Sequence, residues 1–161
     1  MTGVRIRVAD SSDAAGITRV YMESAAHHAR IDPERCYLPD SQFIEDRYRE
    51  GRQHPEAELP SVTLVAEFGG DIVGFLDAQL QKPFDPMLRP FLYCFVADVA
   101  VAESHRDKGI GQQLMESAES WARQHNADYM SLMYNSGNAR VRELYARLGY
   151  EQGAVSLTKR L

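Results

Sequence analysis

The chain contains few of the features that mark secreted, disulfide-stapled or membrane-spanning proteins. Its 161 residues include only two cysteines, Cys36 and Cys94. Their unrelated contexts favour free thiols in a reducing compartment, although two cysteines could in principle form a disulfide. Asp98 interrupts the best of several short apolar runs, and the N-terminus lacks the apolar segment of a secretory signal. We therefore expect a cytoplasmic protein.

The composition is that of an ordinary globular protein, with 44% apolar and 25% charged residues. The length suits one domain over residues 1–161, which can fold without a disulfide or a metal. The net charge of −5 argues against nonspecific nucleic-acid binding. Residues 1–105 carry 10 Lys and Arg against 17 Asp and Glu, whereas residues 106–161 carry 8 against 6. This asymmetry suits a cationic substrate and a polyanionic cofactor, or simply two solvated faces of different charge.

The order of elements predicts an α/β (α+β) domain built on one mixed sheet. Gly69-Gly70-Asp71 is typical of a hairpin turn between two apolar strands. From alternation, caps and breakers, we expect strands over residues 4–8, 62–68, 72–80, 91–101, 129–134 and 154–161. Helices are expected after the caps at residues 10–12, from residue 39 to about 51, and over residues 109–125 and 138–148.

A glycine-containing turn joins the strongest strand to a helix. Gly109 and Gly111 allow the backbone to approach a ligand, and the amides at the helix start are free to donate. Arg106 and Lys108 add positive charge, so the turn is a plausible pyrophosphate cradle. It is not a Walker A loop, because Lys108 precedes Gly109. It is not a dinucleotide fingerprint either, because Leu114 stands where a third glycine is needed.

Two segments resemble the GNAT N-acetyltransferases. Val101 followed by Arg106-x-x-Gly109-x-Gly111 is similar to the acyl-CoA-binding motif of that family, with Glu103 in place of the usual proline. Residues 138–150, which include Asn138, Tyr145 and Gly149-Tyr150, resemble the second CoA motif. The resemblance covers roughly residues 92–150.

The resemblance implies the GNAT fold, a mixed twisted sheet of about six to seven strands flanked by about four helices. It also implies acetyl-CoA as cosubstrate and no metal, with the amide of Val99 polarising the thioester carbonyl. Tyr145 would then protonate the leaving thiolate, whereas helical periodicity alone makes it a packing residue. The cofactor-binding residues implied are Val99, Ala100, Val101, Arg106, Asp107, Lys108, Gly109, Ile110, Gly111, Gln112, Asn138 and Tyr145.

Asp98 is the single carboxylate in the strand at 91–101. A period of two would place it on one face with Leu92, Cys94, Val96 and Ala100. Burial there would raise its pKa and suit a general base, but a structural carboxylate bonded to neighbouring backbone is equally compatible with the pattern.

Other reactive side chains form no recognisable site. His27 and His28 have no metal-ligand spacing with Cys36 or His105. Cys94 has no histidine partner that the sequence can place beside it, and it is typical of a small core residue.

The acceptor should bind near the first two helices and the loop after them. The acidic excess favours a small cationic amine over an acidic peptide. The alternatives are a protein N-terminal or lysine acetyltransferase, and a noncatalytic acyl-CoA-binding regulatory module, which would not require Tyr145. We expect neither nucleic acid nor membrane as a partner, and a homodimer is compatible with the family.

Overall fold

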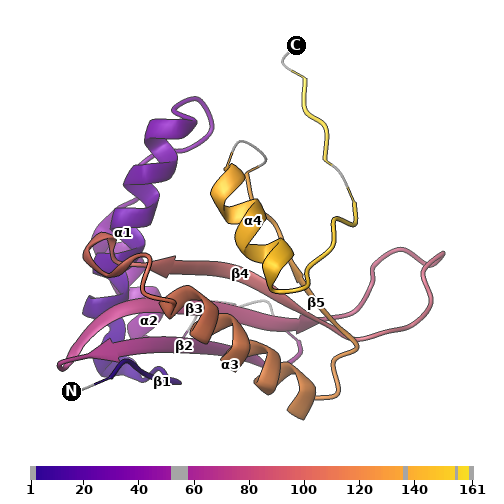
Figure 1. Cartoon of the computed structure of the whole chain (residues 1–161), viewed down its shortest axis with the longest axis horizontal. Coiled ribbons are helices and arrows are strands. Elements are labelled where there is room, and N and C mark those ends of the chain that lie inside the picture. The colour runs from indigo at the N-terminus through magenta and orange to yellow at the C-terminus, as the bar shows by residue number, and fades with distance from the viewer. Residues whose placement is uncertain (1–2, 52–57, 136–137, 155, 160–161) are drawn as a thin grey trace.

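The computed structural model of the chain describes residues 3–51, 58–135, 138–154 and 156–159 (Figure 1). The helices are α1 (Ala14–Ile31), α2 (Ser41–Arg49), α3 (Ile110–Gln124) and α4 (Ala139–Arg147), with short 3-10 helices at Ser11–Asp13 and Glu103–His105. The strands are β1 (Arg5–Val8), β2 (Ser61–Phe68), β3 (Asp71–Gln81), β4 (Tyr93–Val101) and β5 (Tyr129–Leu132).

The strands form one mixed sheet in the order β1-β2-β3-β4-β5. Neighbours are antiparallel except for β4 and β5, which are parallel. The predicted β2–β3 hairpin is confirmed, and Gly69 and Gly70 both have positive φ in its turn. The α/β class and the mixed sheet are confirmed with five strands in the described residues, fewer than the six to seven expected.

The strand expected over residues 154–161 is not formed at positions 154 and 156–159, which have no regular secondary structure. Leu157 is 90% exposed, so its side chain is not held against the sheet. An alternating sequence stays in a sheet only where its apolar face is buried, and this segment lacks that support.

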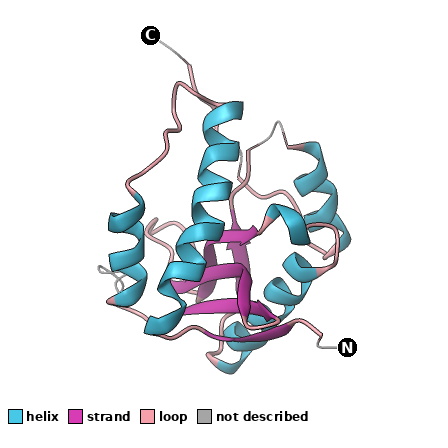
Figure 2. Cartoon of the chain, turned by 90° about the vertical axis from the view of Figure 1, so that its left-hand side faces the viewer, coloured by secondary structure: helices cyan, strands magenta, loops and turns pink. Residues whose placement is uncertain are grey.

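Helices lie on both sides of the sheet (Figure 2). α3 and Tyr145 of α4 pack on the face that carries Leu76, Cys94 and Val96. α1 and α2 pack on the opposite face, around Phe75. Among the described residues, no helix has the length and apolar character needed to cross a membrane.

A glycine brings α1 close to the sheet. A Cβ atom at Gly16 would lie 2.8 Å from the side chain of Ile72, so any larger residue would push α1 away from β3. This close packing sets the distance between α1 and the face of the sheet on which the pocket described below is built.

A β-bulge in β4 reverses the alternation of its side chains. Asp77 pairs with Asp98 and Ala78 pairs with Val96, so Ala97 is the extra residue. Asp98 and Ala100 therefore face the α1 side, whereas Cys94 and Val96 face the α3 side. The single face predicted for Leu92, Cys94, Val96, Asp98 and Ala100 is wrong, because a strict period of two does not survive an inserted residue.

The second half of β4 has an open edge. β5 pairs with β4 only from Tyr93 to Val96, and β4 then continues beyond the end of β5 toward α1 (Figure 1). Residues 98–101 pair with β3 on their other side. The parallel pair thus separates midway, leaving backbone groups of β4 without a strand partner within the described residues.

Candidate active site

The turn before α3 exposes a set of backbone amides. Gly109 has φ of 76° and precedes the helix, and Asp107 also has positive φ. Gln113 donates to the carbonyl of Gly109 at 3.1 Å, which is an i-to-i+4 bond that begins the helical ladder. The amides of Ile110, Gly111 and Gln112 precede that bond and point out of the helix end. No acidic residue occupies the first turn of α3, so the helix dipole there favours an anion.

The cations of this turn are tied to its backbone. The Nε of Arg106 donates to the carbonyl of Val101 at 3.2 Å, and the Nζ of Lys108 donates to the carbonyl of Ser104 at 3.1 Å. Arg140 at the start of α4 forms an ion pair with Asp107, and both side chains are largely exposed. Sequence reasoning missed Arg140, because nothing local indicates that the start of α4 meets this turn.

The open edge of β4 leads from the turn toward the middle of the sheet. Val99 and Val101 pack toward the α3 face, while Ala100 packs on the α1 face. Their backbone pairs with Leu76, Gly74 and Phe75 of β3. An extended ligand arm beside this edge can therefore hydrogen-bond to β4 as a further strand would.

Tyr145 lies on the α3 side of the sheet and is 8% exposed. Its ring contacts Tyr134 and Tyr150, with centroids 6.1 and 5.7 Å away. Burial raises the pKa of its hydroxyl, which therefore keeps its proton at neutral pH. That hydroxyl has no hydrogen-bond partner within the described residues, which is unusual for a buried phenol.

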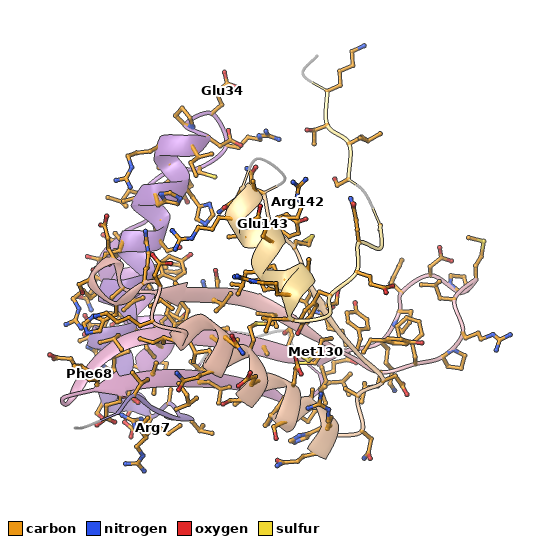
Figure 3. The ribbon with its side chains drawn as sticks, viewed as in Figure 1. Arg7, Glu34, Phe68, Met130, Arg142 and Glu143 are labelled. Atoms are coloured by element: carbon orange, nitrogen blue, oxygen red, sulfur yellow. The ribbon has the colours of Figure 1, made fainter. Side chains whose placement is uncertain are left out.

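Asn138, the other predicted residue at α4, caps this helix, and a nearby arginine is exposed. The side chain of Asn138 accepts from the amide of Val141 at 3.2 Å, so its oxygen caps the helix. Its amide nitrogen is the group left for a ligand. Arg142, near the N-terminal end of α4, is exposed (Figure 3).

A pocket of about 320 Å³ lies on the opposite face of the sheet. It is built from α1, the connection to α2, and the two central strands. Its walls are Tyr21, Ser24, Ala25, His28, Arg35, Cys36, Tyr37, Pro39, Phe75 and Asp98. Tyr21 stacks on Phe75 with ring centroids 6.2 Å apart, which gives the pocket an aromatic wall. The pocket lies in the region where we expected the acceptor, but only Asp98 among its residues was predicted as a site residue.

The Asp98 carboxylate faces this pocket and is itself open to it. Desolvation by the surrounding protein is the main cause that raises its pKa to about 6, and the nearby Asp77 adds to the shift. Asp98 has no hydrogen-bond or ion-pair partner in the described part of the chain. The structural carboxylate bonded to neighbouring backbone is therefore not what the structure contains.

A second carboxylate lies directly opposite Asp98. Asp77 is 3% exposed and accepts hydrogen bonds from the hydroxyls of Tyr48 at 2.6 Å and Thr63 at 2.7 Å. Sequence reasoning missed it, although Asp77 interrupts an apolar strand just as Asp98 does. The same signal would have found both.

His28 and Cys36 line the pocket, but the histidines and cysteines of the described residues build no metal site. In the regions that the structure describes, no three His, Cys, Asp or Glu side chains gather as metal ligands. Cys36 and Cys94 are both free thiols. Burial raises the pKa of the Cys94 thiol to about 11, so it is not ionised at neutral pH, which agrees with its prediction as a core residue.

Comparison with known proteins identifies the family. The model of the acetyltransferase (GNAT) family matches residues 24–150. An L-methionine sulfoximine/L-methionine sulfone acetyltransferase of Salmonella typhimurium is 30% identical over 145 residues, which cover 90% of this chain and 78% of that protein.

Solved structures agree on the fold. A mutant of the BH1408 protein from Bacillus halodurans has a TM-score of 0.86 at 21% identity, over 98% of this chain and 99% of that one. AAC(6')-Iy in complex with the bisubstrate analog CoA-S-monomethyl-acetylneamine has a TM-score of 0.71 at 18% identity, over 99% of both chains. These matches confirm the predicted fold and class of enzyme. The chain belongs to the acetyltransferase (GNAT) family.

Proposed function

We propose that this protein transfers the acetyl group of acetyl-CoA to the primary amine of a small cationic molecule. The observation that carries the proposal is the Asp98 carboxylate, which has no hydrogen-bond partner among the described residues and faces a pocket at the open edge of β4. A carboxylate in such a pocket attracts an ammonium group and can take its proton.

The residues on the α3 side fit the cosubstrate. The free amides of Ile110, Gly111 and Gln112 and the positive end of α3 would hold the pyrophosphate. Arg106, Asp107, Lys108 and Gly109 shape the turn around it. Acetyl-CoA supplies the acetyl group as an activated thioester.

The strand edge and α4 would hold the rest of the cosubstrate. The backbone of β4 from Val99 through Ala100 to Val101 would pair with the extended arm, as a neighbouring strand would. The amide of Val99 would polarise the thioester carbonyl. The side-chain nitrogen of Asn138 would donate to the arm.

Asp98 faces the pocket on the α1 side of the sheet, and Tyr145 is buried in the core on the α3 side. An ammonium bound in the pocket would lose one proton to Asp98, and its nitrogen lone pair would then form the new bond to the acetyl carbon. As the carbon–sulfur bond breaks, the sulfur would receive a proton from Tyr145, whose raised pKa keeps that proton available. The amide nitrogen then loses its remaining extra proton to water. Asp98 releases the proton that it accepted and the Tyr145 phenolate regains one from solvent, so each turnover releases one proton in total.

The shape and charge of the pocket favour a small cationic acceptor. A volume of about 320 Å³ suits a small molecule rather than a folded protein surface. Arg35 forms an ion pair with Asp32 at 2.8 Å, so its charge is already compensated. The Salmonella relative is named for L-methionine sulfoximine and L-methionine sulfone, which are small molecules with one amine, and this supports a small amine as acceptor.

Two alternatives remain distinguishable by experiment. A protein N-terminal or lysine acetyltransferase would act on a peptide amine reaching into the same pocket. A noncatalytic acyl-CoA-binding module would use the turn before α3 without transferring the acetyl group. The buried, unpartnered Tyr145 hydroxyl favours an enzyme, since binding alone gives no reason to retain it.

An amine panel with acetyl-CoA, followed by thiol release and product mass, tests the proposal. We expect small cationic amines such as polyamines and aminoglycosides to be acetylated faster than neutral or acidic ones. Peptides with free N-termini or lysines serve as the competing arm. Faster acetylation of peptides would replace the proposal with the protein-directed alternative, and tight acetyl-CoA binding without turnover on any amine would favour the noncatalytic module.

A further inference from the structure

Two carboxylates lie opposite each other across the strands that form the floor of the pocket. Asp77 of β3 and Asp98 of β4 are register partners, and the bulge at Ala97 is what brings both to the same face. Side chains directly opposite on neighbouring strands have Cβ atoms about 5 Å apart, and like charges in such a pair are destabilising. A fold that keeps this pair accepts a cost in stability at its candidate active site.

The surroundings of the two carboxylates differ. One oxygen of Asp77 accepts from the Tyr48 hydroxyl at 2.6 Å, and the other accepts from the Thr63 hydroxyl at 2.7 Å. Two hydroxyl donors stabilise the charged form of a carboxylate. Asp98 has no such donor among the described residues and opens to the pocket. The environment of Asp77 favours a carboxylate that stays charged, whereas the environment of Asp98 favours one that exchanges a proton.

We propose that Asp77, fixed by the hydroxyls of Tyr48 and Thr63, is a positioning residue that makes Asp98 the proton acceptor of the pocket. The inference rests on the proposed function in one respect, that Asp98 takes the proton of the acceptor amine. The negative charge of Asp77, next to Asp98, increases the affinity of the Asp98 carboxylate for a proton. Asp98 can therefore accept a proton from the bound ammonium near neutral pH.

Other titratable groups line the pocket or interact with Asp98. They are Tyr21 and His28 of α1, Arg35 and Tyr37 of the connection, Arg47 and Tyr48 of α2, and Asp77 of β3. After desolvation, Asp77 is the largest influence that raises the pKa of Asp98, whereas Arg47 lowers it. Asp77 is thus the group whose charge favours the protonated form of Asp98.

The test is the pH dependence of kcat/KM for one amine, compared between wild type and Asp77→Asn. Asparagine keeps the shape of the side chain and removes its charge. The acidic limb of the profile should move to lower pH by about one unit, while the ionisation of the amine itself is the same in both proteins. Asp71→Asn, at the exposed start of the same strand, removes an equal charge and should leave the limb in place. A limb that stays in place in Asp77→Asn, while Asp98→Asn abolishes it, would overturn the proposal.

Carbon-13 NMR titration of the carboxyl groups provides a readout that needs neither turnover nor a variant. In wild type, Asp98 should titrate near pH 6. An Asp98 titration near the ordinary value of about 4 would overturn the inference even if Asp77→Asn fails to fold. If Asp98 titrates near 6 in wild type and lower in Asp77→Asn, but Asp98→Asn retains full activity, the tuning by Asp77 stands and the proposed role of Asp98 in transfer fails.

Discussion

At the scale of single residues, the candidate site combines two groups that lack hydrogen-bond partners among the described residues. Asp98 faces a pocket on one side of the sheet, and Tyr145 is buried on the other. Natural structures seldom leave a buried polar group such as the Tyr145 hydroxyl unpaired, and the Asp98 carboxylate is exposed to the pocket, where a ligand can reach it. Substitution of Asp98 or Tyr145 is therefore the most direct test of the proposed chemistry.

Tyr145→Phe removes the proposed proton donor and retains the ring that contacts Tyr134 and Tyr150. We expect kcat to fall roughly 10- to 10,000-fold, while the affinity for acetyl-CoA changes little. Steady-state kinetics under conditions where chemistry limits the rate, with calorimetry for binding, measure both quantities. An unchanged kcat would return Tyr145 to the role of a packing residue.

Asp98→Asn should stabilise the protein at neutral pH. Because the pKa of Asp98 in the folded protein is raised to about 6, the folded state binds its proton more tightly than the unfolded chain does. The ionised carboxylate therefore costs stability as the pH rises from about 4 through 6. Exposure to the pocket screens part of this cost.

Thermal unfolding at two pH values measures this effect. We expect Tm to be roughly 2–4 °C higher than wild type at pH 7 and equal to wild type near pH 3.5. A stabilisation that persists at low pH would point to a packing effect rather than to charge.

At the scale of elements, the turn before α3 and the open edge of β4 are the proposed binding surfaces for the cosubstrate. The helix start offers amides and no acid, and β4 offers backbone groups beyond the end of β5. Helix dipole and strand edge are properties of elements rather than of side chains. The best test of what these elements bind is therefore a substitution that blocks access to their backbone groups.

Gly111→Asp should weaken acetyl-CoA binding strongly. A Cβ atom at this position meets only Val101, at an ordinary contact distance of 3.9 Å, so the variant should fold. The new side chain would place bulk and negative charge where the pyrophosphate is expected. Gly111→Asn, which adds the same bulk without charge, is the matched control and should bind better than Gly111→Asp in calorimetry. Unchanged affinity in a folded Gly111→Asp would contradict the assignment of this turn.

At the scale of the whole molecule, the pocket lies on one face of the sheet, and α3 and Tyr145 of α4 pack on the other. The acidic first part of the chain builds most of the pocket walls with α1 and β3. Arg140 and Asp107 link α4 to the turn before α3 by an ion pair. Under the proposed function, the acidic part would attract a cationic acceptor and the helix start would hold an anionic cosubstrate.

We expect kcat/KM for a cationic acceptor, measured at saturating acetyl-CoA, to fall as salt is added. The acidic excess of residues 1–105 should attract the acceptor, and this attraction is screened beyond about 8 Å at physiological ionic strength. A neutral amine of similar size should show little salt dependence. If the best acceptor proves acidic, or if salt leaves its kcat/KM unchanged, the charge argument is wrong while the family assignment still holds.

Local patterns were sufficient to predict most elements and the turn before α3. The β2–β3 hairpin follows from Gly69 and Gly70, and α4 ends before Gly149, which has φ of 86°. Such signals depend on neighbours in the chain, because turn geometry and capping are set within a few residues. The family resemblance at Arg106, Gly109 and Gly111 is local in the same sense.

Only the tertiary structure decided which side chains meet. The alternation in β4 predicted Asp98 on the face of Cys94, but the bulge at Ala97 turned it toward Asp77. The sequence of one segment predicts neither the bulge nor the pairing of two strands, because both depend on the register of the whole sheet. The pocket between α1 and β4 is likewise a product of packing. The sequence by itself therefore determined the elements and the cosubstrate motif, and long-range packing decided where the acceptor can meet them.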